Sequence, residues 1–501
     1  MPWVKINKYW LSIIIVLLFC ITRVPRLHND VVNPDAVNWH YRSQQFINGL
    51  KYKQFEKTYQ HYHPGVTLMW IAGIPIEITK QITKEIVYTQ ANFPLFHLVV
   101  KSSVIFVQAL LTIFIIYLLS KLLSFKNALL ITGLFTLEPF FVGNSRLFHM
   151  DILLSLFVFI SLLCFWISLK EQDLKYAILT GVFLGLSFLT KSVAILAFAY
   201  ILAVSTYKDL FQKNIKRTLI VILSFLFFLF LFFPALWVKP IHYLGEIFSE
   251  AERVGIRKGH KQIVLGESTK NGGVLFYPLV LIMKASPLLI VGSLLFVFAG
   301  LSRKAKTKSF TLTTFLSLFY WGYFFIMFVP SKKLDRYLLV MFPYLAYLSY
   351  FGLKYLVKKM KSPLVPILLV VTFILLPLAT NFPYYFTYVS PLFMGADNAN
   401  KVIGQKPFGV GVFDLRDRIL NKYGSDIRIG FYDTKPMKSI YSNSKVVDVR
   451  VVGPSHYDLL VLAVNEQFPE KIGNSNHLFK KDFSLYINGL EYWRVYVKEN
   501  K

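Results

Sequence analysis

Acidic and basic side chains recur at the ends of long apolar runs, where charge is costly and is usually paired or functional. Asp35 follows the first run, Asp151 begins a later one, and Lys191 separates two short ones. Lysine and arginine can snorkel to a membrane surface, but snorkelling does not explain an acid, so the two aspartates are the sharper signals. Basic groups can hold an anion, and a carboxylate can accept a proton. The candidate site residues are Asp35, Arg42, His63, Arg146, Asp151, Lys191, Lys284, Lys333 and Arg336.

Asp35 lies in the tripeptide Asn33-Pro34-Asp35, which predicts the start of a helix. Asn suits the N-cap, Pro the first helical position, and Asp the first turn. One interpretation is therefore an acid that only stabilises the helix dipole. An aromatic and basic stripe at helical spacing beside the acid favours a functional role instead. This stripe consists of Trp39, Arg42 and Phe46.

Two further features involve side chains that bind ligands. The segment 61–65 (HYHPG) predicts a sharp turn that presents His61 and His63, although two histidines without a fixed third ligand are weak evidence for a metal site. Lys284 lies about ten residues into an apolar run, before Pro287, which would loosen the helix. A lysine that deep either lines a cavity or pairs with an anion.

The composition indicates a polytopic membrane protein. Of the 501 residues, 55% are hydrophobic, and the runs 152–169, 218–237 and 363–386 contain no charged residue. Runs of about 20 apolar residues match the roughly 30 Å hydrocarbon core of a bilayer. The first run is expected to be a retained anchor, because it is long and lacks a cleavage site of small residues. Cys20 and Cys164 both lie in apolar runs, so neither a disulfide framework nor a zinc framework is expected.

Eleven apolar runs define the expected membrane domain, residues 1–386. If they alternate across the membrane from a cytoplasmic N-terminus, six loops face inward, and these hold 18 Lys/Arg against three acids. This asymmetry agrees with the positive-inside rule, and it favours two short helices rather than one within 176–206. The protein is then expected in the plasma membrane, with its C-terminus outside. The runs are 9–26, 95–120, 127–144, 152–169, 176–190, 192–206, 218–237, 274–300, 309–330, 336–353 and 363–386.

The remaining residues, 387–501, predict an outward-facing α/β domain of about 110 residues. Period-2 patterns predict strands at 427–432, 446–452 and 458–464, and a helix at 411–423 is expected to end at Gly424. This tail holds 16 Lys/Arg and 12 Asp/Glu, so most of the net charge of +28 belongs to the membrane part. With no basic groove motif, nucleic-acid binding is not expected.

In the first outer loop, the segment 66–79 predicts an interfacial helix.

Four short strings resemble the dolichyl-phosphate-mannose protein mannosyltransferases and the bacterial lipid A aminoarabinose transferases. Their order, their spacing and their common side of the membrane carry the resemblance, which spans about residues 10–350. The sequence departs from the family pattern at Ala36, where many members have Glu, and at His63, where the aminoarabinose transferases have Lys. The strings are Pro34-Asp35 with Trp39 and Arg42, SRLFHMD ending at Asp151, GLSFLTK ending at Lys191, and KKLDRY containing Lys333 and Arg336.

The resemblance implies a multi-span glycosyltransferase that uses a polyprenyl-phosphate sugar, with Asp35 as the catalytic aspartate. It implies that Lys191 and Arg336, with Lys333 beside them, hold the donor phosphate. Arg42, His63, Arg146, Asp151 and Lys284 are then expected to contact substrate. Transfer with inversion is expected. The acceptor can be a protein, a lipid or a glycan, and the use of a divalent metal stays open. The alternatives are a transporter or flippase of lipid-linked sugars, a polymerase or ligase of lipid-linked glycans, and a structural assembly factor.

Overall fold

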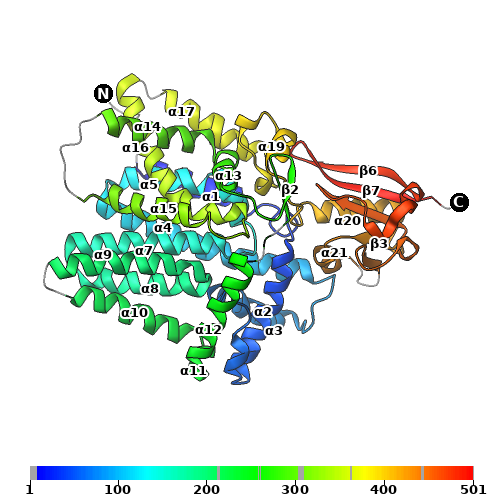
Figure 1. Ribbon diagram of the computed structural model, residues 1–501, viewed down its shortest axis with the longest axis horizontal. Coiled ribbons are helices and arrows are strands. Elements are labelled where there is room, and N and C mark those ends of the chain that lie inside the picture. The colour runs from blue at the N-terminus through cyan, green and yellow to red at the C-terminus, as the bar shows by residue number, and fades with distance from the viewer. Residues whose placement is uncertain are drawn as a thin grey trace.

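Helices make up one end of the molecule, and a small sheet with its own helices forms the other end (Figure 1). The computed structural model describes residues 8–211, 215–257, 259, 261–302, 310–360, 364–441 and 445–499. The helices before the tail are α1 Lys8–Arg23, α2 Pro34–Lys51, α3 Val66–Thr83, α4 Phe93–Leu122, α5 Phe125–Thr136, α6 Pro139–Ser145, α7 Asp151–Glu171, α8 Leu174–Thr190, α9 Ile195–Phe211, α10 Lys216–Phe232, α11 Ala235–Val238, α12 Pro240–Ala251, α13 Phe276–Lys284, α14 Pro287–Ser302, α15 Leu312–Ile326, α16 Phe342–Met360, α17 Leu364–Val370 and α18 Leu376–Thr380.

Each of the eleven apolar runs contains a helix, so the helical membrane fold is confirmed, while the number of spans stays a prediction. Among the described residues, only α4 and α7 are individually long and apolar enough to cross a bilayer. Two runs that were each expected as one span are sharply bent: α5 and α6 meet at 73°, and α13 and α14 at 113°, the latter at Pro287, where a loosened helix was expected. The second half of each pair begins with a proline, which cannot continue the preceding helix.

The two bends contact each other through one buried carboxylate. Glu138, at the bend between α5 and α6, accepts hydrogen bonds from the backbone N–H and the hydroxyl of Ser286, at 2.6 and 2.8 Å. Ser286 directly precedes α14, so the carboxylate satisfies the start of that helix. A transporter is expected to have broken helices around a midplane substrate site. Here the polar groups at the breaks satisfy each other.

The helices α7, α8 and α10 pack side by side and set the position of Lys191. Gly181 in α8 allows this close packing, because a Cβ there would lie 2.0 Å from the hydroxyl of Ser224 in α10. At its other end α8 stops at Lys191, whose extended backbone turns the chain into α9. The expected division of 176–206 into two helices at Lys191 is therefore confirmed. As a result, the lysine side chain lies at the end of a rigid, buried helix.

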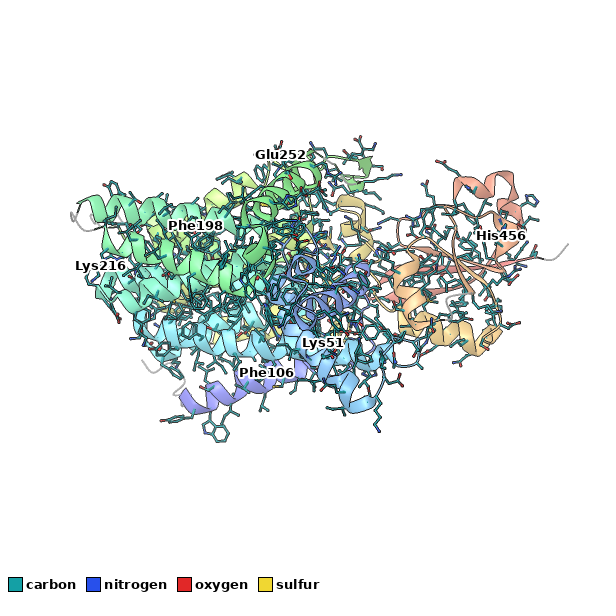
Figure 2. The ribbon with its side chains drawn as sticks, turned by 90° about the horizontal axis from the view of Figure 1, so that it is seen from below. Lys51, Phe106, Phe198, Lys216, Glu252 and His456 are labelled. Atoms are coloured by element: carbon teal, nitrogen blue, oxygen red, sulfur yellow. The ribbon has the colours of Figure 1, made fainter. Side chains whose placement is uncertain are left out.

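One end of the helical part lies beside the tail, and the other end lies far from it. Lys216, in the basic segment 207–217, lies at the end remote from the tail, whereas His456 lies at the far end of the tail itself (Figure 2). The expected interfacial helix 66–79 is found as the longer α3, which packs against α2. Beyond α10, the second outer loop contains α12 and a hairpin of β1 Gln262–Val264 and β2 Glu267–Thr269.

The tail contains a five-stranded sheet of order β4-β3-β5-β7-β6, in which β3, β4 and β5 are parallel. The three predicted strands and the helix that ends at Gly424 are confirmed, but β6 and β7 were not predicted. In β6, register shifts interrupt the alternation of buried and exposed residues that a sequence pattern requires. The tail elements are α19 Ala396–Val402, α20 Val412–Tyr423, β3 Ile429–Phe431, α21 Thr434–Ile440, β4 Val446–Asp448, β5 Leu459–Ala463, β6 Phe479–Ile487 and β7 Leu490–Lys498.

The tail is joined to the first outer loop by backbone hydrogen bonds. The N–H of Val32 donates to the carbonyl of Gly409 at 3.1 Å, and the N–H of Gly411 donates to the carbonyl of Asp30 at 3.2 Å. Gly409 has a φ of +72°, and a Cβ there would lie 1.8 Å from the carbonyl oxygen of Val32. Val31, Val32, Tyr384 and Phe386 pack into the same hydrophobic cluster as the tail. The expected division at residue 387 stays a prediction, because this core extends across it.

Candidate active site

Asp35 is the second residue of α2, and its side chain is 40% exposed. The helix begins at Pro34 as predicted, but the side chain of Asn33 makes no capping hydrogen bond. The Asp35 carboxylate instead contacts two cation-forming groups: Nη2 of Arg336 at 3.0 Å and Nε2 of His149 at 3.4 Å. An acid that served only the helix terminus would not need these partners from two distant segments.

Asp151, the first residue of α7, is buried and lies at the centre of the same cluster. Its Oδ1 lies 2.8 Å from Nζ of Lys191, and its Oδ2 lies 3.0 Å from both Nε of Arg336 and Nδ1 of His149. The two contacts at Oδ2 lack hydrogen-bond geometry, so they are electrostatic in character. A buried carboxylate needs such compensation, because its desolvation is expensive.

The electrostatics of the cluster keep Asp35 ionised. Burial raises the pKa of Asp35, but the hydrogen bond from His149 and the charge of Arg336 outweigh burial and hold that pKa well below its ordinary value. His149 therefore bridges the two carboxylates, and Arg336 contacts both. Four elements meet here: α2, the segment before α7, the end of α8, and the 3₁₀ helix Asp335–Met341.

A cavity of about 290 Å³ opens from this cluster. Its polar end is formed by Asp151, Lys191 and Arg336, with His63 and Lys332 beside them. The rest of its wall is largely apolar and comes from α9, α12, α15 and the segments next to them. The apolar wall residues include Leu154, Val193, Ile195, Leu196, Phe248, Ala251, Ile256, Met327 and Val340. The site is therefore an apolar groove that ends in a cluster of paired cations and carboxylates.

The 61–65 turn packs against the end of α8. The N–H of Gly65 donates to the carbonyl of Thr190, and the hydroxyls of Thr67 and Thr190 are 2.6 Å apart. Burial, assisted by the charge of Lys191, lowers the pKa of His63 well below its ordinary value, so this imidazole is neutral at pH 7. In the described part of the chain, no group of three or more His, Cys, Asp or Glu residues is placed to hold a metal ion.

Three of the predicted site residues lie elsewhere. Arg146 pairs with buried Asp30 at 2.8 Å and also donates to backbone carbonyls. Lys284 donates to the carbonyl of Tyr388 and to Oε1 of Gln405, so it anchors the linker to the tail. Lys333 donates to two carbonyls of its own loop, at 2.6 and 2.7 Å. The partners of these three cations are backbone carbonyls, the amide of Gln405 and the carboxylate of Asp30, and none of them belongs to the cluster around Asp151.

Five of the remaining predicted residues, Asp35, His63, Asp151, Lys191 and Arg336, come together, and three others join them. Arg42 packs over the ring of Trp39, where burial lowers its pKa and the charge of nearby Asp35 opposes that effect. His149 was missed, although it lies two residues before Asp151 in a string that the sequence analysis selected. Lys406 and Phe408 were also missed, because they belong to the tail. The Phe408 ring lies 4.8 Å from the guanidinium carbon of Arg336.

Comparisons with known proteins agree with this geometry. Residues 91–237 match the family described as dolichyl-phosphate-mannose-protein mannosyltransferase. No curated protein sequence matched the chain. The crystal structure of ArnT from Cupriavidus metallidurans bound to undecaprenyl phosphate is similar with a TM-score of 0.53 at 13% identity, covering 98% of each chain. Its apo state gives a TM-score of 0.53 at 13% identity, covering 97% of each.

The Archaeoglobus fulgidus oligosaccharyltransferase, in the apo form, is also similar. Its TM-score is 0.51 at 12% identity, covering 92% of this chain and 70% of that one. At such identities the structural matches establish the fold, and the family match over 91–237 confirms the resemblance inferred from the sequence. The chain therefore has a fold similar to those of ArnT and the oligosaccharyltransferase, and its residues 91–237 match a mannosyltransferase family; the two findings together indicate a glycosyltransferase.

Proposed function

We propose that the protein transfers a sugar from a polyprenyl-phosphate donor to an acceptor hydroxyl at the outer face of the membrane. The observation that carries this proposal is the groove itself: an apolar channel whose inner end holds Lys191 and Arg336, beside the ionised Asp35. A prenyl tail would occupy the apolar wall, and its phosphate would lie at the cations. The match to a fold that binds undecaprenyl phosphate in ArnT supports this choice of donor.

The charge of the donor explains how the cations would assist the reaction. A sugar–phosphate–prenyl diester carries one negative charge, whereas the prenyl phosphate that leaves carries about −1.5 to −2 near pH 7. Negative charge therefore accumulates at the phosphate as the anomeric bond breaks. Cations fixed in a water-poor groove stabilise that developing charge more than they stabilise the bound donor. Lys191 supplies a point charge, and Arg336 can donate two parallel hydrogen bonds.

Asp35 would serve as the general base. The acceptor oxygen attacks the anomeric carbon, the bond from that carbon to the phosphate oxygen breaks, and the acceptor proton passes to the carboxylate. Because the phosphate leaves without protonation, one carboxylate is sufficient, whereas glycosidases need two. Attack opposite the leaving group inverts the anomeric configuration.

Donor binding would also adjust the base. In the free site Arg336 is shared between Asp35 and Asp151, which holds the pKa of Asp35 low. A donor phosphate at Arg336 takes up part of its charge and so raises the pKa of Asp35 toward its ordinary value. The carboxylate then becomes a better proton acceptor when donor is present. The base would therefore be strongest in the donor-loaded protein.

The experiment uses the purified protein in nanodiscs with a panel of polyprenyl-phosphate sugars. We expect one donor to lose its sugar in the presence of a membrane extract as the acceptor source, and we expect this loss to be at least about a hundredfold slower with Asp35→Asn. A flippase would instead move the donor across a liposome bilayer with the sugar still attached. Sugar translocation without any transfer would refute the proposal.

The sidedness has a separate test. Single cysteines replace Gln45 in the first outer loop and Lys359 near the end of α16, in a background without Cys20 and Cys164. A membrane-impermeant maleimide added to intact cells is expected to label position 45 and not position 359, because the basic segment 354–362 is expected to face inward. Labelling at position 359 would show that the segment 354–362 faces outward and that the expected topology is wrong.

A further inference from the structure

A second cavity, of about 700 Å³, lies between the tail and the β1–β2 hairpin. It is separate from the lipid groove and differs from it in character, because twelve of its eighteen lining residues have polar side chains. Gln262 and Lys406 line it, and the same two residues line a small cavity that also reaches Asp335 and Arg336. The two cavities therefore share walls, and the small one extends from the large cavity's lining to Arg336 of the cluster.

One buried polar group in this region has no protein partner. The side chain of Gln262 lies on β1 in a residue that is only 7% exposed, and its Nε2 makes no hydrogen bond. A buried amide donor without a partner is destabilising unless a ligand or water supplies an acceptor. Because Gln262 lines both cavities, this unsatisfied amide lies at their junction, packed against Gly272.

Lys406 adds a cation at the same junction. Among the described residues its ammonium group forms no hydrogen bond or ion pair. Burial lowers the pKa of Lys406 to about 8, while the charge of Asp335 opposes this effect. A lysine kept charged at neutral pH without a direct partner is suited to an anionic group of a ligand.

The opposite wall provides aromatic and hydrogen-bonding groups. Tyr432 and Phe468 belong to the tail and line the cavity, and aromatic side chains of this kind can pack against the apolar face of a sugar. Arg450 is oriented there by Asp448, with contacts of 2.7 and 2.9 Å. Glu466 accepts from the N–H of Ala463 at 2.7 Å and lines the cavity as an acceptor for hydroxyl groups.

We propose that this cavity binds the acceptor, and that the acceptor is a saccharide carrying an anionic group. The size and polar wall suit a hydroxyl-rich molecule, the rings suit its apolar face, and Lys406 with Gln262 places its anionic group near the catalytic cluster. An attacking hydroxyl would then approach Asp35 from the tail side, while the donor phosphate occupies the lipid side. This inference rests on the proposed function and names the acceptor class for it.

The test measures protection of a thiol and requires no donor. A cysteine replaces Ser268, an exposed residue of β2 that lines the cavity, in a background without Cys20 and Cys164. A matched control cysteine replaces Ser455, which is exposed next to His456 at the far end of the tail (Figure 2). The probes are glucose 6-phosphate, glucuronate, uncharged methyl glucoside and an acidic tetrapeptide.

We expect glucose 6-phosphate and glucuronate to slow maleimide labelling at position 268 at least about threefold more than methyl glucoside does, with no effect at 455. Gln262→Ala in the same background is expected to abolish most of this protection, while the thermal transition and undecaprenyl phosphate binding stay normal. Equal labelling with all probes, or protection by the peptide alone, would overturn the inference. If the donor assay fails while saccharides still protect position 268, the proposed function is wrong and the saccharide site remains.

Discussion

Replacing Asp35 by Asn tests the chemical role that the cluster assigns to this carboxylate. The amide has the same size, and it can still accept a hydrogen bond from Arg336, so the start of α2 should be preserved. What is lost is the capacity to take up a proton. Removal of a general base costs about 10²–10⁴ in rate, which corresponds to about 3–5 kcal/mol of activation free energy.

The fold should tolerate the change, because the Asp35 side chain is 40% exposed. Solvent screening limits the loss of such an ion pair to about 1 kcal/mol or less. The assay follows release of sugar from a radiolabelled donor under single-turnover conditions, together with donor binding by isothermal titration. We expect turnover to fall at least a hundredfold with donor affinity within about threefold of wild type. A folded variant that turns over within a few-fold of wild type would show that Asp35 only stabilises the helix, and Asp151 would be the next candidate.

Three further predictions follow from the same contacts. Because the pKa of Asp35 is held below its ordinary value, the acid-side decline of turnover should lie below about pH 3.9. The variant His149→Gln removes a hydrogen bond to the carboxylate, so this decline should move to higher pH. An unchanged pH profile in the variant would contradict the prediction. Lys191→Gln should weaken donor binding by about 1.5–3 kcal/mol, measured by titration against Lys239→Gln, an exposed control that should bind normally. Gly409→Ala should lower the melting temperature more than Gly489→Ala. Both glycines have a positive φ, but only at Gly409 would the added Cβ lie 1.8 Å from a carbonyl oxygen, that of Val32, whereas nothing lies within 4 Å at Gly489. Equal shifts in calorimetry would argue against tail docking at that point.

The convergence of Asp35, Lys191 and Arg336 was predictable because charges at the ends of apolar runs on one side must gather at one surface. The roles of Arg146 and Lys284 were not predictable in the same way. A cation near a helix end gives the same sequence signal whether its partner is a ligand or a protein group. Their partners, Asp30 and Gln405, lie more than a hundred residues away in the chain.

The fold shows a similar division. Apolar runs located the helices, because hydrophobic length is a local property. The bend at Pro287 agrees with the loosening of the helix expected there, whereas the bend at Pro139 was missed, since a proline within an apolar run is also compatible with a kinked span. In the same way, Lys406 and Phe408 gave no signal, because only docking of the tail onto the first outer loop brings them to Arg336.

The contact between Glu138 and Ser286 has a consequence for biosynthesis. The two residues are 148 positions apart, and synthesis at about 5–20 residues per second separates their emergence by about 7–30 s. During that interval the carboxyl group of the first bent helix pair lacks the two donors of Ser286, and a buried polar group without hydrogen-bond partners is costly. The arrival of α14 ends this state, so the later bend acts as an assembly checkpoint for the earlier one.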